Sequence, residues 1–311
     1  MRREIGWDDI ERDDRSVLTV GTFDGVHRGH RAIIDHLRSR AREHDGRSTL
    51  ISFDPHPRSV VHGQEVPLLT TVEERAALLE ELGLDRFVVI PFSMDFARLS
   101  PVDYVEEVLV DRIGVHEITV GYDHRFGRNR EGDVDLLREC GERHGFAVDV
   151  IPPQKVDRDV VSSRGIRDTL LSAGDVERAA EQLGRPYQLE GTVARGEGRG
   201  RQIGYPTANL ALEDPRKLVP KRGVYATRVR LPTGETRGGM MNIGRRPTFD
   251  EMEVTVEVHL FDFEGDLYGE TLSVQFLQRL RDEQKFDSPD DLAMQLSEDE
   301  RHCRTIVEEV D

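Results

Sequence analysis

Cysteine is scarce in this sequence: among 311 residues only Cys140 and Cys303 occur, and they lie far apart in the chain. Two distant cysteines exclude a disulfide scaffold and a zinc site built from thiolates. Long apolar runs are missing too, since no 18-residue apolar stretch offers a membrane-spanning helix. Residues 1–16 contain no apolar segment typical of a secretory signal. Together these absences predict a cytoplasmic protein without a membrane segment.

Basic charge is in deficit, and lysine in particular is rare. The sequence holds 60 Asp and Glu against 43 Lys and Arg, for a net charge of −17. A general nucleic-acid binder needs a basic face that displaces counterions from phosphates, so a nucleic-acid partner is not expected. The acidic excess fits either codon composition together with solubility, or a saline cytoplasm.

The length favours two domains, because a single hydrophobic core rarely grows to 311 residues. In the first part of the chain, apolar β-rich runs alternate with helical patterns. Strands are expected at residues 17–23, 48–53, 87–92 and 117–120, with helices from about 24 to 42 and over 72–82. Strands separated by helices predict βαβ units, and therefore a Rossmann-like α/β domain with a parallel sheet.

Near Gly184 the pattern changes to alternation with period two. It runs through residues 187–193, 223–231, 254–261 and 272–277, without intervening helical patterns. Such segments predict a small antiparallel barrel or sandwich. A last helix is expected to begin with Ser288 as N-cap and Pro289 as first residue, and to reach about Val310. The predicted domains are therefore 1–184 and 185–311.

The segment GTFDGVHRGH, residues 21–30, follows the first expected strand and opens the first helix. His27 and His30 are three residues apart and therefore share one helical face. A helix N-terminus presents free N–H groups to phosphate, and Gly25 and Gly29 allow a close approach. A third zinc ligand with suitable spacing is missing, so the pattern favours a phosphate site over a metal site.

This segment resembles the HxGH signature of the adenylyltransferase superfamily. Residues 161–167, VSSRGIR, resemble its SSTxxR element, with Arg164 in place of threonine. Residues 120–133, VGYDHRFGRNREGD, resemble a loop of bacterial FAD synthetases, with His124 in place of an aromatic residue, and FDPHP at 53–57 matches as well. The resemblance implies an ATP and phosphate site formed by Gly21, Phe23, Asp24, Gly25, His27, His30, Asp123, Ser162, Ser163 and Arg167, with both histidines catalytic.

Residues 196–209, GEGRGRQIGYPTAN, are neither a dinucleotide fingerprint nor a P-loop. They resemble the glycine loop and PTAN motif of riboflavin kinases. The resemblance implies a nucleotide loop that consists of Gly198, Gly200, Gly204, Pro206, Thr207 and Asn209. Thr207 and Asn209 would also bind Mg²⁺, which accepts neutral oxygen ligands and completes its shell with water and substrate phosphates.

In EVTVEVHLF, residues 253–261, strand alternation places Thr255, Glu257 and His259 on one face. Glu257 matches the general base of riboflavin kinases, which accepts the proton of the ribityl 5′-hydroxyl. LRDEQKFDS at 280–288 resembles the flavin-side segment of that family. The resemblance implies flavin binding by Pro55, His56 and Pro57 in the first domain and by Arg281, Gln284 and Phe286 in the second.

The matches extend from about residue 17 to 307, and the whole chain resembles the bacterial bifunctional riboflavin kinase/FAD synthetases. This resemblance implies a nucleotidyltransferase domain followed by a β-barrel kinase domain that ends in a helix. With ATP and Mg²⁺, the kinase would convert riboflavin to FMN and ADP, and the first domain would convert FMN to FAD and pyrophosphate. Two alternatives remain at this point: a single-activity riboflavin kinase with an inactive adenylyltransferase scaffold, or a non-enzymatic flavin-binding or regulatory protein.

Overall fold

The computed structural model describes the chain except for residues 153–160, 197–199, 201–203, 248–251 and 311. It divides into two compact units, Met1–Ser163 and Arg164–Asp311. Over the described ranges, no helix is both long and apolar enough to cross a membrane.

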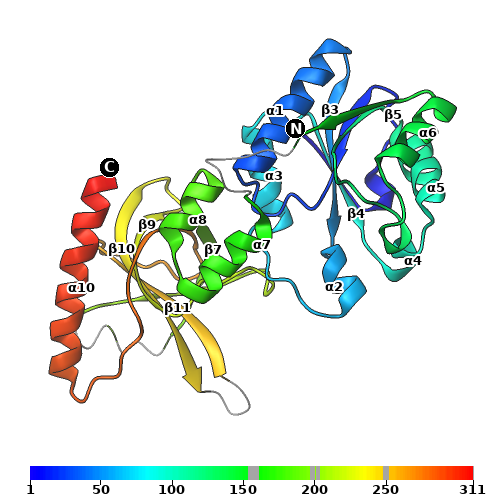
Figure 1. Ribbon diagram of the computed structural model, residues 1–311. Coiled ribbons are helices and arrows are strands. Elements are labelled where there is room, and N and C mark those ends of the chain that lie inside the picture. Colours follow the sequence, from blue (N-terminus) through cyan, green and yellow to red (C-terminus); the bar gives the residue numbers. More distant parts are fainter. Residues whose placement is uncertain (153–160, 197–199, 201–203, 248–251, 311) are drawn as a thin grey trace. The chain divides into compact units, whose positions relative to one another are not determined.

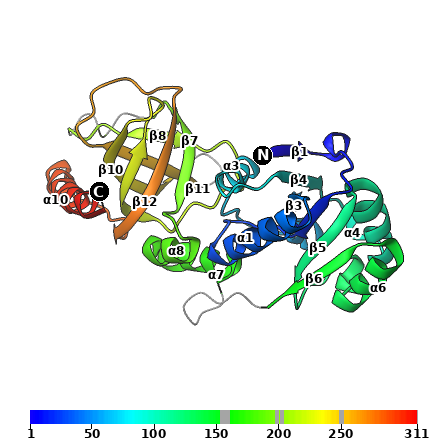
Figure 2. The same ribbon diagram turned by 90° about the horizontal axis from the view of Figure 1, so that it is seen from above.

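The first unit is built on a six-stranded parallel sheet with the strand order β1-β4-β3-β2-β5-β6 (Figures 1 and 2). Its strands are β1 (Arg2–Ile5), β2 (Ser16–Val20), β3 (Arg47–Asp54), β4 (Arg86–Pro91), β5 (Val115–Gly121) and β6 (Ala147–Ile151). In the sheet, β2 lies between β3 and β5: the chain adds β3 and β4 on one side of β2, and later adds β5 and β6 on the other side. The carboxyl end of β2 is therefore at a topological switch point, where ligands bind in open α/β sheets.

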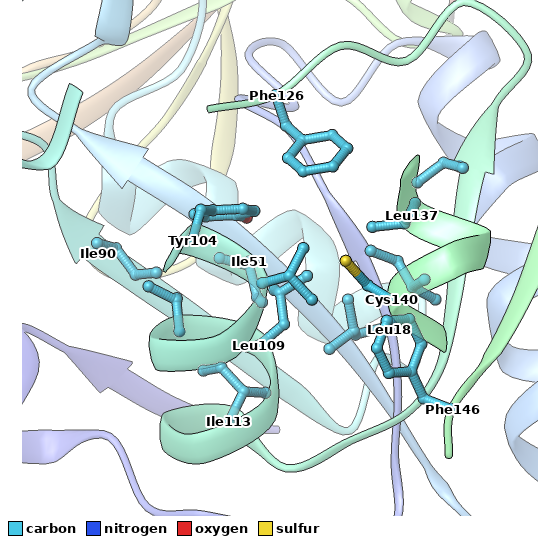
Figure 3. Packing of buried hydrophobic residues seen from close by; sticks show 14 of the residues in the cluster. Leu18, Ile51, Ile90, Tyr104, Leu109, Ile113, Phe126, Leu137, Cys140 and Phe146 are labelled. Carbon is cyan, nitrogen blue, oxygen red and sulfur yellow. The ribbon is translucent and has the colours of Figure 1, made fainter. Parts of the chain in front are cut away.

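Helices cover both faces of this sheet, so successive strand residues enter two different cores. The helical segments are η1 (Trp7–Asp9), α1 (Arg28–Glu43), α2 (Pro57–His62), α3 (Val72–Glu81), α4 (Met94–Ala97), α5 (Pro101–Asp103), η2 (Tyr104–Ile113), η3 (Arg128–Arg130) and α6 (Val134–His144). Val17 and Leu50 pack against α1 and α3, whereas Leu18 and Ile51 pack against η2 and α6 (Figure 3). This arrangement confirms the predicted α/β domain.

The second unit contains a closed antiparallel barrel with the order β10-β11-β8-β7-β12-β9. Its strands are β7 (Gln188–Ala194), β8 (Ala208–Ala211), β9 (Gly223–Arg230), β10 (Thr236–Pro247), β11 (Met252–Leu260) and β12 (Thr271–Arg281). The predicted barrel is confirmed. The sequence pattern had not indicated β10, because Gly238, Gly239 and Gly244 depress its β propensity.

The last helix, α10 (Pro289–Val310), begins as predicted. The Oγ of Ser288 accepts a hydrogen bond from the Asp291 backbone N–H at 3.1 Å, which is the N-cap interaction expected before Pro289. Cys303 lies on its buried side and contributes to an apolar cluster with barrel residues. The helix therefore closes one flank of the barrel.

Three short helical segments precede the barrel: α7 (Ser163–Asp168), η4 (Thr169–Ala173) and α8 (Val176–Leu183). The two compact units meet at residues 163/164, near the start of these helical segments, whereas the predicted boundary lies at their end, after Gly184. Within the second unit, the Lys221 backbone N–H donates to the Leu170 carbonyl at 2.9 Å. The boundary at residues 184/185 stays a prediction, and a fragment that starts there would lack this contact.

Candidate active sites

The loop that follows β2 carries His27 and His30 to the start of α1. His27 is the N-cap residue, and its Nδ1 accepts a hydrogen bond from the His30 backbone N–H at 3.3 Å. The two rings stack with centroids 3.6 Å apart and planes 17° apart. A Cβ at Gly29 would lie 3.2 Å from the His27 ring, tighter than most real contacts. The glycine of the HxGH pattern therefore leaves room for the stacked pair.

The His30 ring lies in a buried aromatic environment. Phe23 stacks on its other side at 4.5 Å between centroids. Burial, then the charges of His27 and Arg75, hold the pKa of His30 well below its ordinary value. Its Nδ1 is buried and has no hydrogen-bond partner among the described residues. Since buried polar atoms are nearly always paired, this nitrogen is a candidate contact for a ligand.

The backbone of this loop is strained. Phe23, Gly25 and Val26 have positive φ angles of 47°, 83° and 40°. Glycine adopts such angles freely, but for a β-branched residue such as Val26 they are unusual. Each non-glycine residue in this region costs about 1–3 kcal/mol, so the surrounding structure has to fix the conformation.

Asp24 supplies much of that support. Its fully buried carboxylate accepts hydrogen bonds from the backbone N–H groups of Leu69 and Thr70 at 3.0 and 2.9 Å, and from the Thr70 hydroxyl at 3.1 Å. The same hydroxyl oxygen accepts a bond from the Gly25 N–H at 3.0 Å. A carboxylate repels phosphate, so these contacts favour loop support over direct nucleotide binding for Asp24.

Arg75 on α3 completes the support and was not anticipated from the sequence. It is buried, and its guanidinium donates to the Ser52 hydroxyl at 2.8 Å and to the Thr70 carbonyl at 3.2 Å. Ser52 in turn donates to the Thr22 carbonyl at 3.1 Å. Ser52 of β3 and Arg75 of α3 therefore support the loop that follows β2.

Other predicted residues of the first unit converge by topology. Because β2, β3 and β5 are neighbouring parallel strands, the residues after their carboxyl ends lie at one edge of the sheet. Gly21 follows β2, Pro55, His56 and Pro57 follow β3, and Asp123 follows β5. The structure thus brings the expected phosphate and flavin segments of this unit to a common edge.

The FDPHP segment forms the turn from β3 into α2. His56 is the N-cap of α2, and its Nδ1 accepts a hydrogen bond from the Arg58 backbone N–H at 3.1 Å. Pro57 is the first helical residue, and the peptide bond before Pro55 is cis. These contacts set the shape of the turn, and flavin binding by it stays a prediction.

The serine and arginine residues predicted from residues 161–167 lie at α7. Ser162 precedes the helix and Ser163 is its first residue. The Ser163 hydroxyl donates to the Asp24 carbonyl at 2.9 Å, which joins it to the histidine loop. Arg167 is buried on the same short helix and belongs to the second unit.

In the second unit, the barrel brings Thr207, Asn209 and Glu257 together. Glu257 on β11 lies opposite Asn209 on β8, and the Thr207 hydroxyl donates to the Glu257 carboxylate at 3.1 Å. On the other side, Glu257 faces Asn242 on β10, a residue the sequence had not singled out. Directly opposed strand residues point to the same face, so Asn242 is a neighbour of this site. A Cβ at Gly196 would lie 2.2 Å from the Asn209 amide nitrogen, so a larger residue there would displace the Asn209 side chain.

Two glycines of the predicted nucleotide loop have structural reasons to be glycine. Gly200 accepts a hydrogen bond from the Tyr205 N–H at 2.8 Å, and a Cβ on it would lie 2.1 Å from the Tyr205 carbonyl oxygen. Gly204 has a φ of 85°. Gly198 lies outside the described residues.

His259 of β11 holds the segment Pro206–Thr207 by a hydrogen bond. His259 Nδ1 lies 2.8 Å from the Pro206 carbonyl oxygen, a hydrogen bond in which the ring N–H donates. The Tyr205 ring meets the His259 ring edge-on at 5.3 Å. His259 shares a strand face with Glu257, as alternation predicts, and therefore links the loop to the strand that carries the carboxylate.

The predicted flavin residues of this unit lie between β12 and α10. Arg281 forms an ion pair with Asp299 of α10 at 2.6 Å, and its guanidinium lies 5.9 Å from the centre of the Phe286 ring. Gln284 is exposed. Arg281 and Phe286 are thus brought together, and much of the Arg281 guanidinium is occupied by α10.

The residues around Glu257 suit a magnesium ion that also binds substrate phosphates. Their side chains supply hydroxyl, amide and carboxylate oxygens, which are ligands that Mg²⁺ accepts. Within the described part of the chain, no group of three or more His, Cys, Asp and Glu residues is placed to hold a metal ion. A metal held by Thr207 and Asn209 would therefore need phosphate and water oxygens to complete its shell.

Comparisons with known proteins give a match for each part of the chain. The FAD synthetase family model matches residues 9–165, and the riboflavin kinase model matches residues 183–307. Proteins named bifunctional riboflavin kinase/FMN adenylyltransferase are similar over most of the chain. That of Haemophilus influenzae is 37% identical, covering 91% of this chain and 91% of its own, and that of Pseudomonas fluorescens is 39% identical, covering 94% and 93%.

A solved structure has the same fold over both units. A Streptococcus pneumoniae crystal structure, described as a macrolide-efflux protein, matches with a TM-score of 0.88 and 32% identity, and covers 98% of this chain and 99% of its own. With two family models that match in order and relatives that cover nearly the whole length, the chain belongs to the bifunctional riboflavin kinase/FMN adenylyltransferase family.

Proposed function

We propose that this chain phosphorylates riboflavin to FMN with release of ADP, and then adenylylates FMN to FAD with release of pyrophosphate. ATP is the co-substrate of both steps. The observation that carries the proposal is the presence of two separate sites in one chain. One is a stacked histidine pair at a helix N-terminus, and the other is a strand carboxylate bonded to the hydroxyl of the PTAN threonine.

In the kinase step, Glu257 accepts the proton of the ribityl 5′-hydroxyl as that oxygen attacks the γ-phosphorus of ATP. The hydrogen bond from Thr207 orients the carboxylate, and the opposed Asn209 lies on the same barrel face. Thr207 and Asn209 would hold Mg²⁺, which would supply positive charge against the transferring phosphate. We assign nucleotide binding to Gly198, Gly200, Gly204 and Pro206 from their match to the glycine loop and PTAN motif.

In the adenylylation step, the FMN phosphate attacks the α-phosphorus of ATP. His27 and His30 donate hydrogen bonds to phosphate oxygens whose charge increases in the transition state, and the positive end of the α1 dipole favours the same anion. Gly21, Phe23 and Gly25 shape the loop, Asp24 and Ser163 support it, and Asp123, Ser162 and Arg167 complete the phosphate site. A preorganised, strained loop suits this role because it does not have to rearrange during the reaction.

Flavin contacts complete the proposal. Pro55, His56 and Pro57 bind FMN at the sheet edge, and Arg281, Gln284 and Phe286 bind riboflavin at the barrel. The domains 1–184 and 185–311 each carry one activity, and the enzyme works in the cytoplasm.

The test is a chromatographic assay of the purified full-length protein with riboflavin, ATP and Mg²⁺. We expect FMN to form first and FAD to follow. If FMN accumulates and no FAD forms, even when FMN is supplied directly, the protein is a single-activity riboflavin kinase. Flavin binding without any turnover would make the protein a binder.

A further inference from the structure

Asp299 is a buried carboxylate that the proposed reactions do not use. It lies on α10, is 2% exposed, and faces the barrel side of the helix. A buried carboxylate is destabilising unless it is paired and hydrogen-bonded. Here Arg281 donates to it through Nε at 3.0 and 3.1 Å and through Nη2 at 2.6 Å, and the Gln295 amide adds a fourth bond at 3.0 Å.

The other contacts of Arg281 reach into the segment that follows β12. Its Nη1 donates to the Asp282 carbonyl at 3.0 Å, and the guanidinium lies 5.9 Å from the centre of the Phe286 ring. One planar group therefore holds Asp299 on one side and the chain of residues 282–286 on the other. A guanidinium keeps this geometry because its five donors are fixed in one plane.

The same segment reaches the neighbourhood of Glu257. A Cβ built on Gly244 of β10 would lie 2.7 Å from a Glu283 carboxylate oxygen and 3.2 Å from the Asn242 amide nitrogen. Glu283 and Asn242 therefore both lie close to Gly244, and Asn242 is the strand partner of Glu257. A shift of residues 282–286 would therefore change the surface beside the catalytic carboxylate.

We propose that Asp299 is a positioning residue for riboflavin: through Arg281 it fixes the segment 282–286 against the barrel, so that this segment forms the flavin side of the kinase site. This inference rests on the proposed kinase function. Asp299 touches neither flavin nor nucleotide, and its effect is transmitted by the guanidinium that it orients.

The chain offers a matched control for the simpler role of docking α10. Arg304, on the same helix, donates to Asp262 at 2.7 and 3.0 Å, and its guanidinium lies 4.5 Å from the centre of the Phe261 ring. This second ion pair also ties α10 to the barrel, but its partners lie outside residues 281–286. If Asp299 served only to dock α10, breaking either ion pair would therefore have the same effect.

The experiment compares Asp299→Asn with Asp262→Asn in the full-length protein, in steady-state assays of riboflavin phosphorylation and FMN adenylylation. We expect Asp299→Asn to raise the KM for riboflavin about 10-fold or more, since a hydrogen bond to a charged group contributes about 1.5–3 kcal/mol. The KM for ATP and the rate of FMN adenylylation should each change by less than about twofold, because Asp299 contributes no hydrogen bond to either. Asp262→Asn should leave all three near their original values.

A double variant and a conservative variant complete the test. Adding Asp299→Asn to Arg281→Gln should raise the KM no further, because the two residues act as one unit. If Asp299→Asn does not fold, Asp299→Glu keeps the charge, and we expect it to raise the riboflavin KM while kcat is retained. An unchanged riboflavin KM in an active Asp299 variant, or equal increases from Asp262→Asn, would overturn the inference. An inactive unmodified protein would instead overturn the proposed kinase function.

Discussion

The two units place their reactive residues on different kinds of scaffold. In the first, His27 and His30 follow a loop with three positive φ angles, and buried contacts from residues 52, 70 and 75 hold that loop. In the second, Glu257, Asn209 and Asn242 lie opposite one another on paired strands, so the register of the sheet sets their spacing. The first site therefore depends on remote support, whereas the second depends on strand pairing.

The largest effect should come from Glu257→Gln. The amide keeps the size of the side chain but cannot accept the hydroxyl proton. General-base catalysis contributes about 10²- to 10⁴-fold, or about 3 to 5.5 kcal/mol of barrier. Turnover of riboflavin should fall by that factor, with flavin affinity and FMN adenylylation nearly unchanged. Turnover at the original rate would reduce Glu257 to an ordinary strand residue.

Replacing His27 and His30 together with asparagine should suppress conversion of FMN to FAD by about 10²- to 10³-fold, the range seen when transition-state hydrogen-bond donors are lost. Riboflavin phosphorylation should persist, because the histidines belong to the other unit. Initial rates measured with each flavin substrate separately check this. Equal losses in both reactions would contradict the independence of the two sites.

Thr70→Val tests the remote support of the first site. Valine has nearly the same shape but loses the hydroxyl bonds to Asp24 and Gly25. Removing a hydrogen bond to an ionised group costs about 1.5–3 kcal/mol. The denaturant midpoint should fall, as followed by fluorescence of Trp7, the single tryptophan, which lies in the first unit. Adenylylation should weaken more than kinase turnover, and a uniform loss of both would argue against a local role.

Mild acid should affect the first unit more than the barrel. Burial lowers the pKa of His124 to about 4, and burial also holds the pKa of His30 well below its ordinary value. The unfolded chain takes up these protons below about pH 6.5, so their contribution to stability is complete above that pH and is lost as pH falls toward 4. In the barrel, arginine neighbours lower the pKa of Asp262 and Asp282, whose contribution is lost only below their ordinary value of 3.8.

The Trp7 denaturant midpoint, measured between pH 7.5 and 4.5, reports this acid effect. His124→Phe removes one of the titrating groups and should make the midpoint less dependent on pH, the smallest of the changes expected here. A variant with the same pH dependence as the original protein would show that His124 does not contribute.

Short-range patterns predicted the residues whose positions depend on local geometry. The spacing of His27 and His30 predicted that they are neighbours, as their stacked rings are, although His27 is the N-cap of α1 and not a helical residue. Strand alternation predicted the face of Glu257. Thr70 and Arg75 could not be predicted in the same way, because their contacts with the loop join residues about 45 to 50 positions apart. Likewise Arg281 was identified through its segment, but its pairing with Asp299 depends on how α10 returns to the barrel.

The contrast between an open sheet and a closed barrel also bears on how the chain avoids misassembly. A closed barrel has no outer strand whose backbone can pair with another chain, whereas the parallel sheet ends at β1 and β6. The sequence of β1, Arg-Arg-Glu-Ile, is short and charged, and such strands are poor templates for pairing. β6 is apolar apart from Asp149, which lies 2.6 Å from His36 of α1. During synthesis, when the first unit emerges before the barrel, β6 is thus the strand most exposed to aggregation.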